Sequence, residues 1–209
     1  MGTEDGERVG LRERKKQETR IALSWAAIRL AVERGLENVR VEDIAAEVGV
    51  SPRTFNNYFS SKGEAIAARH LDRARWIAAE LRAQPASKPL WEAITDAALA
   101  RFALGQEGDG KHTPDQQWVA GLRLMLAEPA LQGEFFKAGA IAEAELAAAV
   151  AERTGTDVTH DLYPRLVAGA VGAAIAVVME QWMRADPPVP IMALLSDALR
   201  QLAAGLPVP

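Results

Sequence analysis

The sequence contains no cysteine, only three histidines, and neither a glycine-rich phosphate loop nor a nucleophile elbow. The missing cysteine excludes disulfides, thiolate zinc sites and thiol-based sensing, and it fits a reducing cytosol. His70, His112 and His160 include no pair at the i,i+4 spacing of a helical metal site. We therefore expect no metal and no cofactor, and the residues give little support to an enzyme.

Long hydrophobic runs are also missing. The longest is Leu166–Met179, which is shorter than the roughly 20 residues that span a bilayer. It predicts a buried helix of a soluble protein and no membrane partner. The N-terminus is charged and lacks the apolar region of a signal peptide, so we expect a cytoplasmic protein.

Charge is distributed unevenly along the chain. Residues 1–75 hold 14 Lys and Arg against 12 Asp and Glu, whereas residues 76–209 hold 10 against 16. Residues 8–20 are the most basic stretch, with Arg14, Lys15 and Lys16 at its centre. This pattern favours a polyanion that binds at one end of the molecule only. The alternative is a solvated N-terminal tail.

Apolar residues recur at helical spacing along most of the chain, and no stretch shows strand alternation. The sequence therefore predicts an all-α protein. The expected helices cover residues 11–34, 41–48, 52–59, 61–82, 90–104, 114–127, 129–154, 160–185 and 188–204. We expect residues 1–11 to form a disordered arm, and the helices after it fall into an N-terminal group over residues 12–60 and a C-terminal group over residues 61–209.

Glycine and proline mark the helix ends in the first domain. Gly35 is expected to end the first helix in a left-handed conformation, and Gly49 to end the helix 41–48. Ser51 suits an N-cap, and Pro52 suits the first position of the next helix.

The short helix after Pro52 has two chemically different faces. At 100° per residue, Phe55 and Phe59 fall together and must face a core. Arg53 and Asn57 point nearly opposite, flanked by Thr54 and Asn56, with Tyr58 at the border. An arginine fork can pair with guanine, an asparagine with adenine, and hydroxyls with phosphates. The alternative is an ordinary soluble surface, but asparagine is a poor helix former.

These segments resemble a known family. The pattern R-x-x-L-x-x-A-A at Arg20–Ala27, then Gly35, then VEDIAAEVGVSPRTFNNYFSSK, resembles the N-terminal domain of tetracycline-repressor (TetR) family regulators over about residues 14–65. The resemblance implies that residues 12–60 form a three-helix, helix-turn-helix DNA-binding domain and that residues 61–209 form a helical effector-binding and dimerisation domain.

The same resemblance assigns DNA contacts. It implies that the contacts are made by Arg40, Ser51, Arg53, Thr54, Asn56, Asn57, Tyr58 and Lys62. Lys62 matches a phosphate-contacting lysine of the family. Arg40 stands where threonine is frequent, and Asn56 replaces the commonest tyrosine, so the base preference can differ from the family's.

The acidic C-terminal part needs a role other than DNA binding. Gly169, Gly172, Ala173 and Ala176 permit close helix contact, and Leu195, Leu199, Leu202 and Leu206 form one stripe. With the resemblance, this predicts a homodimer through the last two helices. The alternative is that both helices pack only within the monomer.

Bulky apolar residues in the middle helices are the default candidates for an effector pocket. They are Trp91, Phe102, Trp118, Leu122, Met125, Phe135 and Phe136, and each could equally be ordinary core. The stretch LAEPALQGEFF…AERTG…DLYPRLVAGA resembles the C-terminal domain of those TetR-type regulators that include sensors of acyl-CoA-like molecules.

The sequence thus predicts a homodimeric transcriptional repressor that a small molecule, of acyl-CoA-like chemistry, releases from a palindromic operator in double-stranded DNA. Two alternatives remain at this point. One is an all-helical small-molecule-binding protein or enzyme with a structural helix-turn-helix. The other is a transcriptional activator of the same family.

Overall fold

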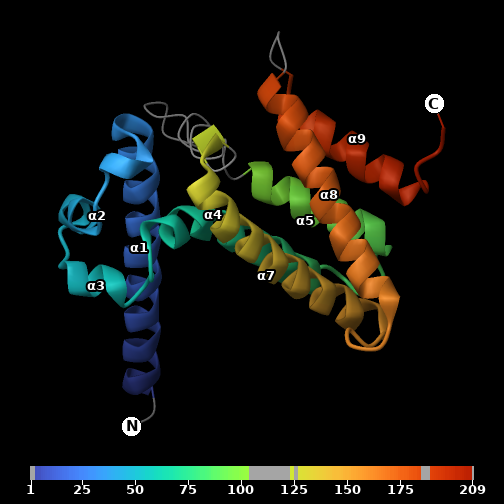
Figure 1. The fold of residues 1–209 in the computed structure, drawn as a ribbon. Coiled ribbons are helices and arrows are strands. Elements are labelled where there is room, and N and C mark those ends of the chain that lie inside the picture. The colour runs from blue at the N-terminus through green and yellow to red at the C-terminus, as the bar shows by residue number, and fades with distance from the viewer. Residues whose placement is uncertain (1–2, 104–122, 125–126, 185–188, 209) are drawn as a thin grey trace. The chain divides into compact units, whose positions relative to one another are not determined.

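The structure is a computed structural model that describes residues 3–103, 123–124, 127–184 and 189–208. These residues form helices and connecting turns and include no strand (Figure 1), which confirms the predicted all-α class. The chain divides into two compact units. The first contains Met1–Arg69 and Gln117–Phe135, and the second contains His70–Gln116 and Phe136–Pro209.

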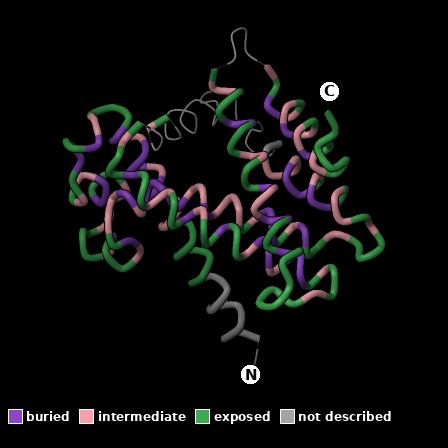
Figure 2. Tube along the Cα trace, turned by 45° about the vertical axis from the view of Figure 1, so that its right-hand side comes forward, coloured by how far each residue is buried: buried purple, intermediate pink, exposed green. Residues whose placement is uncertain are grey.

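The first unit is built from α1 (Thr3–Arg34), a 3-10 turn η1 (Leu36–Asn38), α2 (Val41–Val48) and α3 (Pro52–Asn56). The first turns of α4 (Lys62–Ala83) and of α7 (Pro129–Thr154) complete it. Its core contains Leu23, Ala27 and Leu30 of α1 together with Ile44 of α2 and Phe55 of α3, all at most 2% exposed. In Figure 2 the buried residues follow the inner sides of these helices.

The N-terminal segment differs from the prediction. α1 begins at Thr3, not at about Leu11, so residues 3–11 belong to a helix where a disordered arm was expected. Glycine and charge suggested disorder, but the segment opens with acidic residues, which helix N-termini favour, and it continues a helix already stabilised by a packed core.

The two glycines have different conformations. Gly49 has φ 75° and ψ 30°, and the amides of Gly49 and Val50 donate to the carbonyls of Ala46 and Ala45, which is a Schellman arrangement at the residue where the helix was predicted to end. Gly35 has φ 81° but ψ 143°. The expected left-handed helical cap is therefore wrong, and Gly35 instead has a positive-φ conformation outside that region, which only glycine adopts easily. A Cβ there would lie 2.6 Å from Oε1 of Glu37.

The boundary between the units falls inside α4, whereas the sequence suggested residue 61. Ala65, Ile66 and Ala68 are buried, so the first two turns of α4 belong to the core of the first unit. Gly63 lets the start of α7 approach closely, because a Cβ there would lie 3.3 Å from the Leu131 side chain. α4 thus contributes residues to both units.

The second unit contains the remainder of α4 and α7, with α5 (Leu90–Ala103), α8 (Leu162–Arg184) and α9 (Ile191–Ala203). These bounds confirm the predicted helices to within about three residues, and Pro164 lies in the first turn of α8 as expected. The predicted helix 114–127 lies outside the described residues, apart from positions 123, 124 and 127.

Two ion pairs fix the register of α4 against α7 within the second unit. Nε of Arg75 lies 2.7 Å from Oε1 of Glu145, and Arg82 binds both carboxylate oxygens of Glu152 at 2.7 and 3.0 Å. Both partners advance by seven residues from one pair to the next, which requires the two helices to run in parallel. The hydrogen bond from Arg82 holds the pKa of Glu152 below its usual value.

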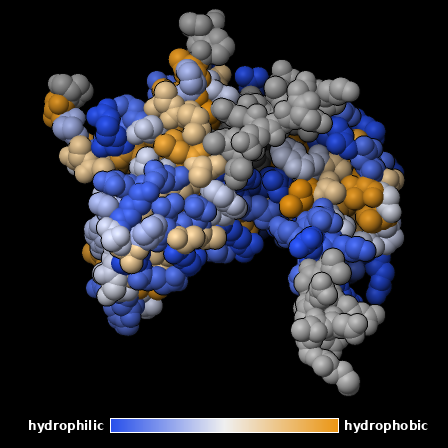
Figure 3. All heavy atoms as spheres, turned by 180° about the vertical axis from the view of Figure 1, so that it is seen from behind, coloured by the Kyte–Doolittle hydropathy of each residue, from blue (hydrophilic) through white to orange (hydrophobic). Residues whose placement is uncertain are grey.

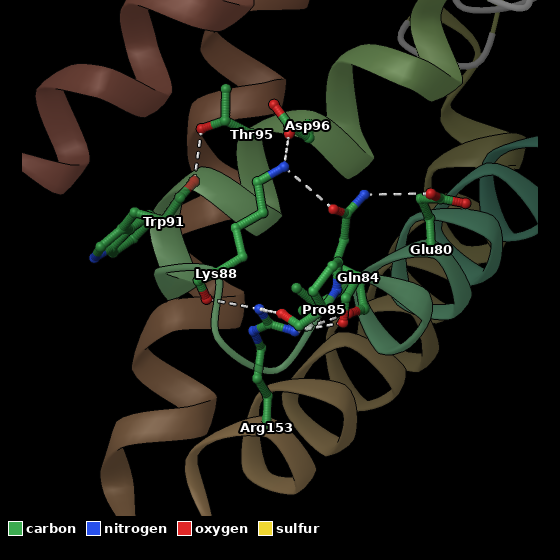
Figure 4. Close-up of polar contacts among 9 residues, drawn as sticks. Glu80, Gln84, Pro85, Lys88, Trp91, Thr95, Asp96 and Arg153 are labelled. Atoms are coloured by element: carbon green, nitrogen blue, oxygen red, sulfur yellow. Dashed lines mark hydrogen bonds and ion pairs between the residues drawn. The ribbon is translucent and has the colours of Figure 1, made fainter.

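Arg153 completes this contact at the end of α4. Its guanidinium donates to the carbonyls of Gln84 at 3.1 Å, Pro85 at 2.6 Å and Lys88 at 2.7 Å (Figure 4). The carbonyls of Gln84 and Lys88 lie where the helix end and the following turn leave backbone groups without helical partners, whereas the carbonyl of Pro85 also accepts the backbone N–H of Lys88. Lys88 in turn binds Gln84 and forms an ion pair with Asp96 of α5. One arginine on α7 therefore holds the connection between α4 and α5.

His70 is the first residue of the second unit. Burial, and then the charge of Arg73, lower the pKa of its imidazole to about 4. The unfolded chain, with a pKa near 6.5, binds a proton at higher pH than the folded chain does. Protonation of this imidazole therefore favours unfolding as the pH falls from 6.5 towards 4.

The last two helices use their apolar faces differently. In α9, Leu195 and Leu199 of the predicted stripe are buried together with Ile191, and α9 packs within the protomer against α5 and α8, whereas Leu206 is 64% exposed. α8 was expected to be buried on more than one side, yet Leu162 is 75%, Leu166 65% and Val177 60% exposed. By length and composition alone α8 could cross a membrane, a test that core helices of soluble proteins also pass.

Candidate nucleic-acid interface

α3 begins with a complete N-cap. The Ser51 hydroxyl accepts the backbone N–H of Thr54 at 3.1 Å, and Pro52 occupies the first helical position. Oγ of Ser51 also lies 2.9 Å from Oγ1 of Thr54. The two hydroxyls predicted to contact DNA thus already bind each other, and each keeps part of its hydrogen-bonding capacity for a phosphate oxygen.

Two phenylalanines anchor α3 in the core. Phe55 is fully buried and Phe59 is 2% exposed, and their ring centroids lie 5.6 Å apart. Their burial turns the other side of the helix outwards, where Arg53, Asn56 and Asn57 are exposed. Tyr58 is half-buried at the rim.

Asn57 lies where a poor helix former is tolerated. It is the C-cap of α3, the position where the helix ends, so its low helix propensity costs little there. The poor helix propensity of asparagine therefore favours a function at Asn56 alone. What supports a DNA contact at Asn57 is its exposure beside Arg53.

α2 presents a cation at its N-terminus. Arg40 is its exposed N-cap residue, and the carboxylate of Asp43 accepts the Arg40 backbone N–H at 2.9 Å. The Asp43 carboxylate therefore serves the helix start, while the Arg40 side chain reaches solvent. A phosphate at this position would also meet the positive end of the α2 dipole.

Lys62 has a structural role that the sequence did not reveal. Its ammonium donates to the carbonyl of Leu36 at 2.5 Å and to that of Val39 at 2.8 Å. These two bonds connect the start of α4 to the turn between α1 and α2. An ammonium has three N–H donors, so one remains for the predicted phosphate contact.

Arg20 is a further residue whose contact sequence reasoning missed. Its guanidinium carbon lies 5.3 Å from the centroid of the Phe59 ring, within the range of a cation–π contact. The available signal was spacing, because Arg20 lies near the helix face of Leu23 and Ala27 and so points towards the core side of α1. Arg20 therefore links α1 to the segment that follows α3.

Sequence comparison matches this architecture. The profile described as "Bacterial regulatory proteins, tetR family" matches residues 25–68, and the one described as "MftR C-terminal domain" matches residues 88–207. The HTH-type transcriptional regulator TcmR of Streptomyces glaucescens is 33% identical over 180 residues, which cover 85% of this chain and 79% of TcmR. The chain belongs to the TetR family of transcriptional regulators.

Solved structures share the fold of this TetR-family chain. The fatty acid degradation regulator FadR of Bacillus halodurans aligns with a TM-score of 0.60 and 17% identity, covering 91% of this chain and 97% of that one. SmeT, the repressor of a Stenotrophomonas maltophilia multidrug efflux pump, gives 0.57 and 20%, with 93% and 95% covered. FadR of Thermus thermophilus in complex with lauroyl-CoA gives 0.55 and 19%, with 91% and 96% covered.

Family membership settles the general function. The chain is a DNA-binding transcriptional regulator with an N-terminal helix-turn-helix, and its family consists of regulators that bind DNA and small molecules and act as dimers. The predicted class, family and fold are confirmed. The individual DNA contacts remain predictions.

The structure describes only part of the predicted effector pocket. Trp91 is half-buried in the second unit, and Phe136 is 80% exposed. Phe135 is half-buried in the first unit. The side chains of Phe102, Trp118, Leu122 and Met125 lie outside the described residues, so this pocket remains a prediction.

The structural role of the two Lys62 hydrogen bonds in this TetR-family regulator can be tested by substitution. Lys62→Met leaves two carbonyls without their charged donor, and we expect the free energy of unfolding to fall by about 1.5–3 kcal/mol. Urea denaturation measures the change, with Lys15→Met, an exposed lysine of α1, as the control. Unchanged stability with weakened DNA binding would instead make Lys62 a phosphate contact only.

Proposed function

We propose that the chain represses transcription as a homodimer whose two α3 helices read the half-sites of a palindromic operator, and that a small-molecule effector bound by the second unit releases it. The observation that supports this most is the exposed set Arg53, Asn56 and Asn57 on a helix that is capped at one end and anchored by two buried rings. A rigid helix presents these donors in a defined geometry, which base readout requires.

In this proposal the interface divides into two kinds of contact. Arg53 and the two asparagines read base edges in the major groove. Arg40, Ser51, Thr54, Tyr58 and Lys62 hold the phosphates on either side and fix the register. α3 is short and reads few bases, so specificity needs a second copy about 34–36 Å away on the same face of the duplex.

The double variant Arg53→Ala, Asn57→Ala tests the reading role. We expect it to lose discrimination between operator and random duplex, by about 1–3 kcal/mol for each base contact removed. It should remain folded, because both side chains are exposed. Fluorescence anisotropy with the two duplexes measures the ratio, and Arg34→Ala, also exposed in the first unit, is the control. Unaltered discrimination would favour a structural helix-turn-helix instead.

The exposed face of α8 is the proposed dimer interface. Leu162, Leu166, Gly169, Ala173 and Val177 lie within one narrow arc of the helix, with large side chains at its ends and small ones in the middle. An apolar face of this size exposed on one helix marks an interaction site, and the opposite side of α8 packs on α9. Because TetR-family regulators act as dimers, we propose that a second copy of this chain covers this face.

Ala173→Arg places a charge at the centre of that face. We expect the dimer to dissociate and operator affinity to fall far more than half-site affinity. Analytical ultracentrifugation measures the oligomeric state. Ala144→Arg, at an exposed position of α7, makes the same chemical change elsewhere and should leave the dimer intact. A dimer that survives Ala173→Arg would place the interface on another surface.

The effector is proposed to be large and mostly apolar, with an acyl-CoA-like molecule as the first candidate. The Thermus thermophilus FadR complex shows only that the same fold can hold lauroyl-CoA. α4 carries residues of both units, so a shift of α4 is the proposed route of coupling. A coupling of about 1–3 kcal/mol is enough for release, and it must be reciprocal. Titration of lauroyl-CoA with and without operator measures it, and equal affinities would reject this effector.

A further inference from the structure

The N-terminal part of α1 extends past the body of the first unit (Figure 1), and residues 12–20 of it carry several basic side chains. We name residues 12–20 of this extension the α1 arm. Arg12, Arg14, Lys15 and Lys16 are all exposed. The sequence left a solvated tail open as the alternative for this basic stretch, whereas α1 holds each of these cations on a fixed side of a helix.

Most cations of the α1 arm lie on one face of the helix. With Arg12 at 0° on a wheel of 100° per residue, Lys16 lies at about 40°, Arg20 at about 80° and Lys15 at about −60°. Glu13, Gln17 and Glu18 lie outside this arc, and so does Arg14 at about 200°. One side of the arm is therefore basic and without acidic residues, although the segment as a whole is mixed.

This basic face continues the core face of α1. Leu23, Ala27 and Leu30, which are buried, fall at about 20°, 60° and 0° on the same wheel. Where the core ends, Arg20 contacts Phe59 at the end of α3, and Lys16 and Arg12 follow one and two turns further out. In Figure 3 the residues next to the grey N-terminal segment are hydrophilic.

We propose that this face of the arm binds the phosphates of duplex DNA that flanks the bases read by α3. This rests on the proposed function. From Arg20, beside α3, to Arg12 is about 12 Å at 1.5 Å per residue. The arm thus reaches beyond the recognition helix with a cation about every turn. A helix is too thick to enter the minor groove, so the arm binds the backbone and adds affinity without sequence preference.

The double variant Arg12→Gln, Lys16→Gln tests the arm. Glutamine keeps the helix propensity of the replaced residues, so only charge changes. Affinity for a long operator duplex and for a random duplex should fall by a similar factor. The slope of log K against log salt should become shallower by about 0.9 for each phosphate that the variant no longer neutralises. A short duplex without flanking base pairs should show little of this effect.

Arg14→Gln is the matched control, because it removes one positive charge two residues from Arg12 on the opposite side of the same helix. It should leave the salt slope unchanged. An equal decrease in affinity per charge in Arg14→Gln, or an unchanged slope in the double variant, overturns the proposal. Failure of operator discrimination in the unsubstituted protein would refute the proposed function, and the slopes on random duplex would still test the arm.

Discussion

The burial of Phe55 and Phe59 determines which side of α3 faces solvent. A helix of five residues has almost no stability of its own, so its orientation comes from what it packs against. Truncating a buried phenylalanine costs about 3–5 kcal/mol, a large part of the roughly 5–15 kcal/mol that a domain has in total. Contacts on the outer face cannot compete with that, and Arg53 therefore points away from the protein.

Local backbone contacts then fix the rest of the DNA-binding unit around this anchor. The Schellman turn at Gly49 sets the angle between α2 and α3, and the Ser51 cap fixes where α3 starts. Lys62 connects the start of α4 to the turn before α2. None of these contacts uses the exposed side chains of Arg53 or Asn56, which leaves those positions open to change with the operator sequence while the scaffold stays the same.

The sequence predicted local features well and distant contacts poorly. The helix 41–48 was placed to the residue, because Gly49, Ser51 and Pro52 act on their immediate neighbours. The contacts of Lys62 and Arg153 join side chains to backbone carbonyls 23 or more residues away, and no periodicity encodes them. Residues 1–11 were expected to be disordered because they are rich in glycine and charge, whereas α1 begins at Thr3, since the stability of a helix that extends from a core is not a local property. The sequence did predict an interface on the last two helices, but it did not show which side of α8 is exposed, since an apolar helix reads alike whether its own chain or a partner covers it.

The proposal that the guanidinium of Arg53 reads a base edge is tested most directly by measuring affinity for operator duplexes with modified guanines. Operator duplexes in which 7-deazaguanine replaces each guanine in turn lack the N7 acceptor of an arginine fork. We expect one symmetric pair of positions where this replacement weakens operator binding by about 1–3 kcal/mol, the value of a bidentate contact. The Arg53→Ala protein should bind the modified and unmodified duplexes with equal affinity. An equal decrease in affinity for both proteins at every guanine would contradict the proposal.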